Sequence, residues 1–330
     1  MKKTLLATVV AVVCSTSAVL AADMAVKAPV APPPPNPWDI AVGAGLYSDY
    51  VFRGISQSNH RPSVNAYFEP RYNLNENLQL YAGVGGWSIA FANRTSAEID
   101  IYGGIRPVFG KLAFDFGVWY YYYPGGQCFN GGTDFFGNIY GADCFLNGSL
   151  PITGNIIKKD LSFVEYFARA QWTPTDTFGI GASVYYDPDW LQFGTDGLYA
   201  STGIKLTAPG AWMPAGTGLY VSGEIGRYWF GTADQFYAAA PVYPFGIPLP
   251  DYTTWNVGLG LTWSVFTVDL RYYDTDLSEG SCNALTSDFN ATFNPANVSA
   301  INPGGFGSKW CGQAYVASLK ADLTWGSNIK

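Results

Sequence analysis

His60 is the only histidine in this 330-residue chain, so it limits the hydrolytic chemistry that the protein could perform. A serine or cysteine hydrolase built on a histidine base would have to use it. His60 stands beside Ser58 and Asn59 in a short polar stretch, which is more typical of a solvated loop than of a catalytic site. We therefore expect that the protein is not an enzyme and needs no cofactor.

An acidic stretch near the carboxyl-terminal end, DTDLSEG, resembles a calcium-binding loop. Its carboxylates are Asp274, Asp276 and Glu279. Glu279, however, stands where the tight turn of such a loop needs glycine. Loose calcium binding is an alternative interpretation, and we expect no dedicated metal site.

Four cysteines follow the amino-terminal region: Cys128, Cys144, Cys282 and Cys311. An even number in an exported chain favours disulfide bonds, and four cysteines allow three connectivities. The simplest one pairs Cys128 with Cys144 and Cys282 with Cys311, because each bond then lies within a single connection. A zinc site is the alternative, but the spacings are wide and no histidine is near.

The first 21 residues predict a signal peptide. Lys2 and Lys3 precede an apolar run, and a small-residue pattern suited to cleavage ends at Ala21. Residues 22–37 are rich in proline and predict an extended periplasmic spacer. Cleavage leaves 16 basic against 25 acidic residues, so the net charge changes from -7 to -9. An acidic chain argues against nucleic-acid partners.

The composition of the remaining chain indicates a membrane protein that crosses with strands. Charged residues make up only 13% of the sequence and aromatic residues 17%. No mature segment approaches the run of about 18 apolar residues that a transmembrane helix needs. Because backbone groups in a bilayer must all be bonded internally, closed barrels are the alternative to helices. The expected fold is therefore all-β.

Segments of alternating apolar and polar residues predict an antiparallel transmembrane barrel of about twelve strands over residues 38–330. An even number of strands is usual in bacterial barrels. The predicted strands are 38–53, 62–72, 77–87, 97–108, 111–123, 161–173, 177–187, 197–207, 218–229, 252–263, 265–276 and 313–325.

The connections between these strands alternate between short and long, which gives the barrel a direction. Bacterial barrels have short periplasmic turns and long outer loops. We therefore expect outer loops at 124–160, 188–196, 230–251 and 277–312. Aromatic residues on the lipid-facing side should mark both interfaces. At the periplasmic end these are Trp38, Trp172, Trp263 and Trp325, and at the outer end Tyr50, Phe52, Tyr120, Tyr122, Tyr186 and Tyr272.

Charged residues of both signs alternate with the lipid-facing positions and should line the lumen. The candidate lumen-lining charges are Arg53, Glu69, Arg71, Glu98, Asp100, Arg106, Asp115, Glu165, Arg169 and Arg271. They could form a salt-bridged plug or the wall of a narrow pore, since twelve strands lie between packed and open barrels. In particular, three arginines, Arg71, Arg106 and Arg169, could form a free basic arc or could pair with Glu69, Asp115 and Glu165.

The stretch from Ser48 to Gln57, SDYVFRGISQ, resembles the signature of a known family. It is similar to the TorF family, a group named as porins, which is also known as the Gcw_chp family of uncharacterised bacterial outer-membrane proteins. Asn59-His60-Arg61-Pro62 and the strand after it continue the likeness, so the motif covers roughly residues 43 to 70. The resemblance implies a bacterial outer-membrane location and a channel.

The sequence thus predicts an outer-membrane, porin-like channel for passive diffusion of small hydrophilic solutes through a narrow charged lumen. Its expected partners are outer-membrane lipid, lipopolysaccharide and those solutes. The alternative is a non-conducting surface barrel whose disulfide-bonded outer loops bind a partner. An enzyme is the third and weakest hypothesis. The sequence predicts neither the solute nor the oligomeric state.

Overall fold

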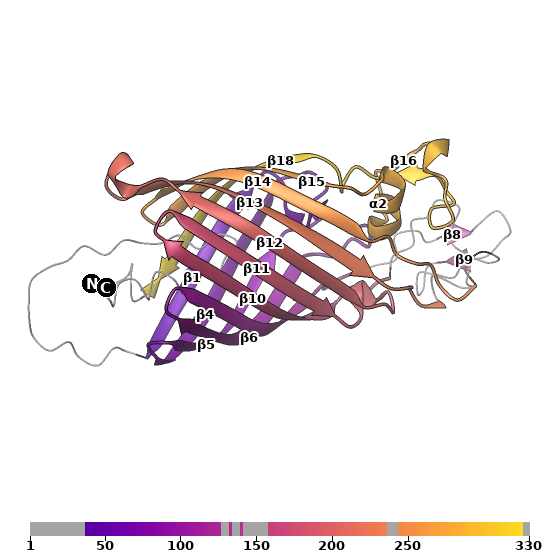
Figure 1. Ribbon diagram of the computed structural model, residues 1–330. Helices are drawn as coiled ribbons and strands as arrows, with labels where there is room; N and C mark the ends of the chain where they lie inside the picture. The colour runs from indigo at the N-terminus through magenta and orange to yellow at the C-terminus, as the bar shows by residue number, and fades with distance from the viewer. Residues whose placement is uncertain are drawn as a thin grey trace, which may run out of the picture.

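Twelve long strands form a single closed, antiparallel barrel in the computed structural model (Figure 1). The structure describes residues 37–126, 132–133, 139–140, 158–235, 242 and 244–325. The barrel strands are β1 (Trp38–Tyr47), β4 (Ser63–Asn75), β5 (Leu78–Trp87), β6 (Glu98–Phe109), β7 (Leu112–Tyr122), β10 (Phe163–Thr175), β11 (Phe178–Asp187), β12 (Gly197–Thr207), β13 (Thr217–Phe230), β14 (Tyr252–Trp263), β15 (Phe266–Thr275) and β18 (Ala314–Thr324). The predicted fold class is confirmed.

The barrel closes because the first strand pairs on both sides. β1 pairs with β4, its neighbour along the chain, and with β18, the last strand. Closure removes free strand edges and satisfies the backbone groups within the wall. Among the described residues, no helix is long and apolar enough to cross a membrane.

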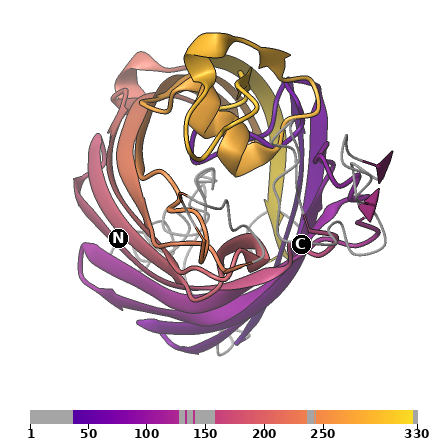
Figure 2. The same ribbon diagram turned by 90° about the vertical axis from the view of Figure 1, so that its right-hand side faces the viewer.

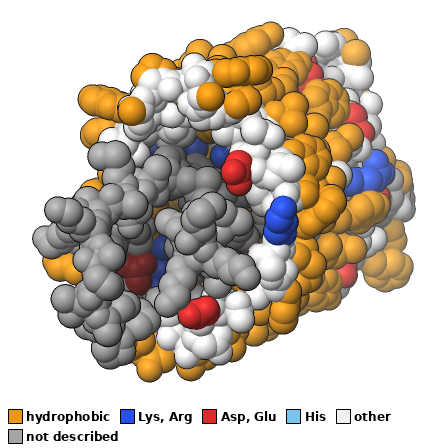
Figure 3. Space-filling view, turned by 60° about the vertical axis from the view of Figure 1, so that its left-hand side comes forward, with side chains coloured by type: hydrophobic (Ala, Val, Ile, Leu, Met, Phe, Trp, Pro, Cys, Tyr) orange, Lys and Arg blue, Asp and Glu red, His pale blue; other side chains and the backbone are white. Residues whose placement is uncertain are grey.

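Side chains alternate between the two faces of this wall, as the sequence pattern predicts. The outward positions carry exposed aliphatic residues, for example Leu46, Val184 and Leu259. Figure 3 shows this hydrophobic surface on one side of the barrel. Trp38, Trp172, Trp263 and Trp325 are exposed at the ends joined by short turns. The protein is a β-barrel of the bacterial outer membrane.

The long connections all lie at the other end, which we call the outer end. They contain short elements: the strand pair β2 (Val51–Phe52) and β3 (Ile55–Ser56), β8 (Gly132–Thr133) and β9 (Ile139–Tyr140), η1 (Trp190–Gln192), α2 (Glu279–Thr286), β16 (Thr292–Phe293), η4 (Pro295–Asn297) and β17 (Phe306–Gly307). At the periplasmic end, the unusually long link 208–216 holds η2 (Gly210–Trp212). Figure 2 looks into the outer end and shows α2 at one side of the opening.

The first predicted strand, 38–53, is too long. β1 ends at Tyr47, where the Ser48 N–H donates to the Ala317 carbonyl and the Ala317 N–H donates to Ser48 Oγ, both at 2.9 Å. The chain then leaves the wall and folds into the barrel. Tyr50 and Phe52, which were expected to face lipid, therefore point inward, and Tyr50 is buried.

Candidate functional site

Residues 48–62, which we call the plug hairpin, enter the barrel from the outer end with Arg53 and Gly54 at the tip. Val51 pairs with Ser56 and Phe52 with Ile55, so two residues make the turn. Their φ angles are 47° at Arg53 and 82° at Gly54, the left-handed pair of a tight hairpin turn. Arginine is unfavourable in this backbone region, so contacts of its side chain must offset the strain.

Glycine is required at the second turn position because the barrel wall is close. A Cβ atom on Gly54 would lie 2.4 Å from Thr254 Oγ1 and 2.3 Å from Thr275 Cγ2. The turn is therefore pressed against β14 and β15. The Tyr252 hydroxyl donates a 3.1 Å hydrogen bond to the Arg53 carbonyl, which fixes the tip from a third direction.

The Arg53 guanidinium forms a two-pronged ion pair with Glu165 on β10. Its two terminal nitrogens lie 2.5 and 3.0 Å from the two carboxylate oxygens, and one of them also donates to the Tyr228 hydroxyl at 3.0 Å. The Tyr121 hydroxyl donates to Glu165 at 3.0 Å. The side chains of Arg53 and Glu165 are 6% and 1% exposed, so this ion pair is removed from water.

Aromatic rings enclose the same guanidinium. Its central carbon lies 4.4 Å from the ring centres of Tyr185 and Tyr199, 4.6 Å from that of Phe52 and 5.2 Å from that of Tyr228. Rings at this distance attract a cation through their electron-rich faces. We call Glu165, Tyr185, Tyr199 and Tyr228 the cation pocket.

The base of the hairpin is organised by one buried carboxylate. Asp49 accepts hydrogen bonds from Ser56 Oγ at 2.7 Å, Ser58 Oγ at 2.8 Å and His60 Nδ1 at 2.8 Å. The other ring nitrogen of His60 lies 3.0 Å from the Lys309 carbonyl oxygen. The hydrogen bond to Asp49 raises the pKa of His60 above its usual 6.5, because the charged ring can donate to both oxygens. His60 therefore fastens the hairpin to the last loop.

A second layer, formed by the last outer loop, covers the hairpin. The Ser56 N–H donates to the Trp310 carbonyl at 2.8 Å, and Trp310 Nε1 donates to Asn59 Oδ1 at 2.9 Å. Cys282 on α2 forms a disulfide with Cys311, next to Trp310. The other two cysteines, Cys128 and Cys144, lie outside the described residues.

Hydrophobic side chains fill the space between the two layers. They belong to a buried cluster that includes Ile55, Tyr123, Phe163, Trp190, Tyr252, Leu285 and Trp310. A cavity of about 60 Å³ remains among them. The outer end of the barrel thus has its own core, which helps to close it to solvent.

Carboxylates line the wall around the hairpin. Glu98 accepts hydrogen bonds from Tyr50 at 2.7 Å and Tyr123 at 2.8 Å. Asp100 Oδ1 and Asp187 Oδ2 are buried and have no hydrogen-bond partner within the part of the chain that the structure describes. In the same part, no group of three or more Asp, Glu, His or Cys side chains is arranged to hold a metal ion.

The predicted basic arc lies nearer the periplasmic end, and its arginines are paired. Arg106 contacts Glu69 at 2.8 Å and Asp115 at 3.4 Å, while Arg169 contacts Asp115 at 2.7 Å. Arg71 contacts Glu69 at 2.6 Å. The hypothesis of free guanidinium groups is therefore wrong. The pairing hypothesis is right for Glu69 and Asp115 but not for Glu165, because Glu165 bonds Arg53.

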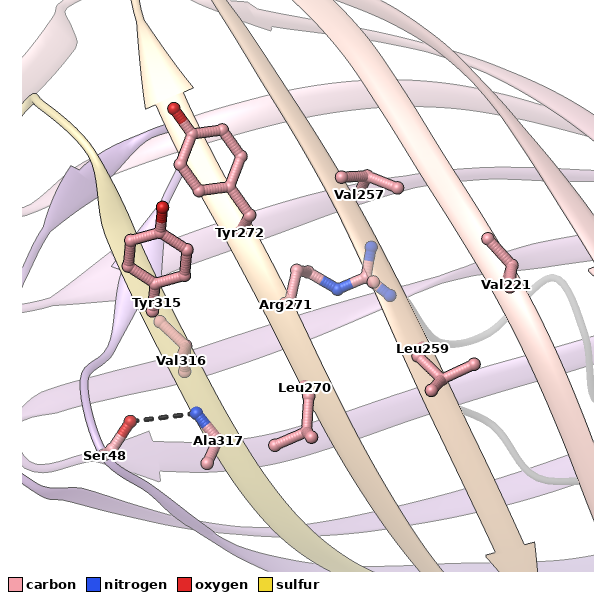
Figure 4. A pocket seen from close by; sticks show the side chains of 11 residues that line it. Ser48, Val221, Val257, Leu259, Leu270, Arg271, Tyr272, Tyr315, Val316 and Ala317 are labelled. Atoms are coloured by element: carbon pink, nitrogen blue, oxygen red, sulfur yellow. Dashed lines mark hydrogen bonds between the residues drawn. The ribbon is translucent and has the colours of Figure 1, made fainter.

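The opposite wall carries Arg271, the last of the predicted lumen charges. Its guanidinium bonds Asp269 at 3.0 and 3.1 Å and crosses Gly258 to reach Ser222 at 2.8 Å. Figure 4 shows this part of the wall, with a groove of about 550 Å³ lined by Val257, Leu270 and other exposed residues of the lipid-facing surface. The groove belongs to that surface.

All ten predicted lumen charges point into the barrel, but they form separate groups. Arg53 and Glu165 meet in the cation pocket, and Glu98 and Asp100 lie on β6 beside it. The three arginines of the predicted arc pair with Glu69 and Asp115. Arg271 pairs with Asp269 on the opposite wall. Sequence reasoning missed Tyr185, Tyr199 and Tyr228. The alternation along β11, β12 and β13 contained a signal for them, since all three occupy inward positions.

Comparisons with known proteins bear on family and fold. The model of a family described as "Bacterial protein of unknown function (Gcw_chp)" matches residues 31–301. No curated protein shows a significant sequence match to the chain.

Similar solved structures include an outer membrane channel from Pseudomonas putida F1, with 10% identity, 91% of this chain and 100% of that chain covered, and a TM-score of 0.42. NanC porin has 8% identity and a TM-score of 0.40, with 86% of this chain and 100% of that chain covered. LpxR from Salmonella typhimurium has 9% identity and a TM-score of 0.39, with 86% of this chain and 99% of that chain covered. At such distances these similarities carry no argument about function.

Proposed function

We propose that this chain, which belongs to the Gcw_chp family of bacterial proteins of unknown function, is an outer-membrane channel that the plug hairpin closes. In the open state it would pass small hydrophilic solutes through a narrow, charged lumen. The observation that carries the proposal is that the plug hairpin, and not a wall strand, lies in the outer end of the lumen. A hairpin that is separate from the wall lies inside the outer end, so its withdrawal would widen the lumen there without unpairing a wall strand.

The inner wall supports the proposal because several of its largest side chains lie flat. A Cβ atom on Gly83 would lie 2.3 Å from the Tyr102 ring, and one on Gly260 would lie 2.0 Å from the Tyr220 ring. Each tyrosine therefore lies on a glycine of a neighbouring strand, which reduces how far the ring projects into the lumen.

Removing the hairpin tests the proposal directly. Tyr47 and Ser63 are cross-strand partners, so a two-residue Asn-Gly turn can replace residues 48–62 without changing the register of β1 and β4. We expect proteoliposomes that contain this variant to swell in small sugars and amino acids faster than those with the wild-type protein. A folded variant that admits no solute would contradict the proposal.

A second candidate function is a non-conducting surface barrel whose outer loops bind a partner. The observation in its favour is the outer layer, in which the Cys282–Cys311 disulfide and the Trp310 contacts hold the last loop on the hairpin. Under this hypothesis neither the wild-type protein nor the hairpin-free variant admits solutes.

A further inference from the structure

We propose that the cation pocket is a binding site for small organic cations with a guanidinium group, and that Arg53 occupies it as a tethered ligand. Such a cation would compete with Arg53 and release the plug hairpin. Binding at this site is a claim separate from conduction, whereas passage of the same cations rests on the proposed channel function.

The pocket contains the two elements that recognise a planar organic cation. Glu165 presents both oxygens to the two guanidinium nitrogens, which is the bidentate geometry that favours guanidinium over ammonium. The rings of Tyr185 and Tyr199, each 4.4 Å away, provide the aromatic faces. Aromatic faces with a carboxylate are typical of sites for organic cations.

The pocket is part of the barrel, whereas the present ligand is part of a loop. The pocket residues stand on four consecutive strands of the wall, which pair in order: Glu165 on β10, Tyr185 on β11, Tyr199 on β12 and Tyr228 on β13. Arg53 and Phe52 come from the hairpin. If the hairpin leaves, the carboxylate and three of the four rings remain in place.

The charge around the pocket favours a cation at this position. Among the described residues, Arg53 is the ion-pair partner of the buried Glu165 carboxylate, and leaving such a buried charge unpaired is costly. Asp100 and Asp187 each add a buried oxygen without a hydrogen-bond partner in the described residues.

The backbone of Arg53 gives a free cation an advantage in this competition. Arg53 binds only with its φ angle at 47°, a left-handed conformation that a non-glycine residue adopts at a cost. A small cation in solution avoids this cost. The absence of this strain offsets part of the entropy that the free cation loses on binding, so the cation can compete with Arg53 at high concentration.

The test removes the tethered ligand and supplies a free one. Arg53→Ala should leave a pocket that binds methylguanidinium with a millimolar dissociation constant, measured by the change in tryptophan fluorescence or in unfolding temperature. Urea has a similar planar shape but no charge, so it should have no effect at the same concentration. Adding Glu165→Gln should weaken methylguanidinium binding by about tenfold or more. Arg61→Ala, which removes an exposed arginine from the same loop, is the matched control and should show no binding.

Folding of the variant provides a second readout. If Arg53→Ala does not fold alone, its refolding yield in detergent should recover with millimolar methylguanidinium and not with urea. Equal effects of methylguanidinium and urea, or no effect of either, would overturn the proposal. These readouts do not involve conduction, so a failure here is distinguishable from a failure of the channel proposal.

Discussion

Neutralising Glu165 should release the plug hairpin while leaving the barrel intact. Glu165→Gln keeps the size of the side chain but leaves the Arg53 guanidinium without its counter-ion in a site where both side chains are almost fully buried. Breaking a buried ion pair in this way costs about 3–5 kcal/mol. The surrounding tyrosine rings still attract the guanidinium, so we take the lower value. At about 1.4 kcal/mol per factor of ten, the ratio of released to docked hairpin should rise about 100-fold.

Hydrogen exchange at the contacts of the hairpin measures this ratio. The Ser56 N–H bonds the Trp310 carbonyl, and the Ala90 N–H of the β5–β6 connection bonds the Gln57 carbonyl, so both amides are protected by contacts that the docked hairpin makes with the rest of the protein. We expect their exchange to accelerate about 100-fold in Glu165→Gln, with unchanged protection in β12 to β15. Glu76→Gln, in an exposed periplasmic turn, is the control. If exchange at these two amides stays at the wild-type rate, the ion pair does not hold the hairpin.

Three further predictions concern the base of the hairpin, its cover and the lumen wall. NMR titration of His60 should give a pKa above 6.5; the stability that this group contributes is then present below pH 6.5 and is lost as the pH rises through the folded-state pKa. Reduction of the Cys282–Cys311 bond, which joins residues 29 positions apart, should lower stability by about 3 kcal/mol in denaturant titrations and expose the last loop to protease. Gly260→Ala should force the Tyr220 ring off the wall at a cost of about 1–3 kcal/mol, and the heat-dependent shift of the barrel in detergent gels should move to lower temperature.

The barrel wall was predictable because its signal is local. Each strand has one face toward lipid and one toward the lumen, so the period of two appears in the sequence itself. The predicted ranges 197–207 and 252–263 coincide with β12 and β14. The alternation of short and long connections also follows from chain spacing alone, and in the described part of the chain the short turns and the long connections do join opposite ends of the strands.

The plug hairpin was not predictable in the same way, because aromatic side chains that face lipid and those buried inside the barrel give the same alternating sequence pattern. The rings of Tyr50 and Phe52 are as apolar as lipid-facing rings, and the alternation of β1 continues through them. The last contact of β1 with the wall is the pair of hydrogen bonds between Ser48 and Ala317, a residue far away in the sequence, and the chain leaves the wall after it. A local signal did exist in Gly54, because glycine suits the second position of a two-residue hairpin turn.

The pairing of charges depends on strand register and loop entry, which the sequence does not reveal. Alternation placed Glu165 in the lumen correctly, yet its partner is a loop residue 112 positions earlier. Arg53 lies inside the barrel and bonds Glu165, the carboxylate that the sequence had suggested as a partner of the basic arc. The disulfide between Cys282 and Cys311 is easier to predict from the sequence, because both cysteines lie in one loop. The Cys128–Cys144 bond stays a prediction.

Single-channel recording in planar bilayers tests the central claim most directly. The claim is that the barrel conducts and that the docked hairpin closes it. We expect the wild-type protein to be closed for most of the record and to open in brief events. Glu165→Gln should increase the open fraction, because it weakens the attachment of the hairpin and leaves the pairing of the wall strands intact. The absence of current in the wild-type protein, in Glu165→Gln and in the hairpin-free variant, with all three folded, would contradict the account.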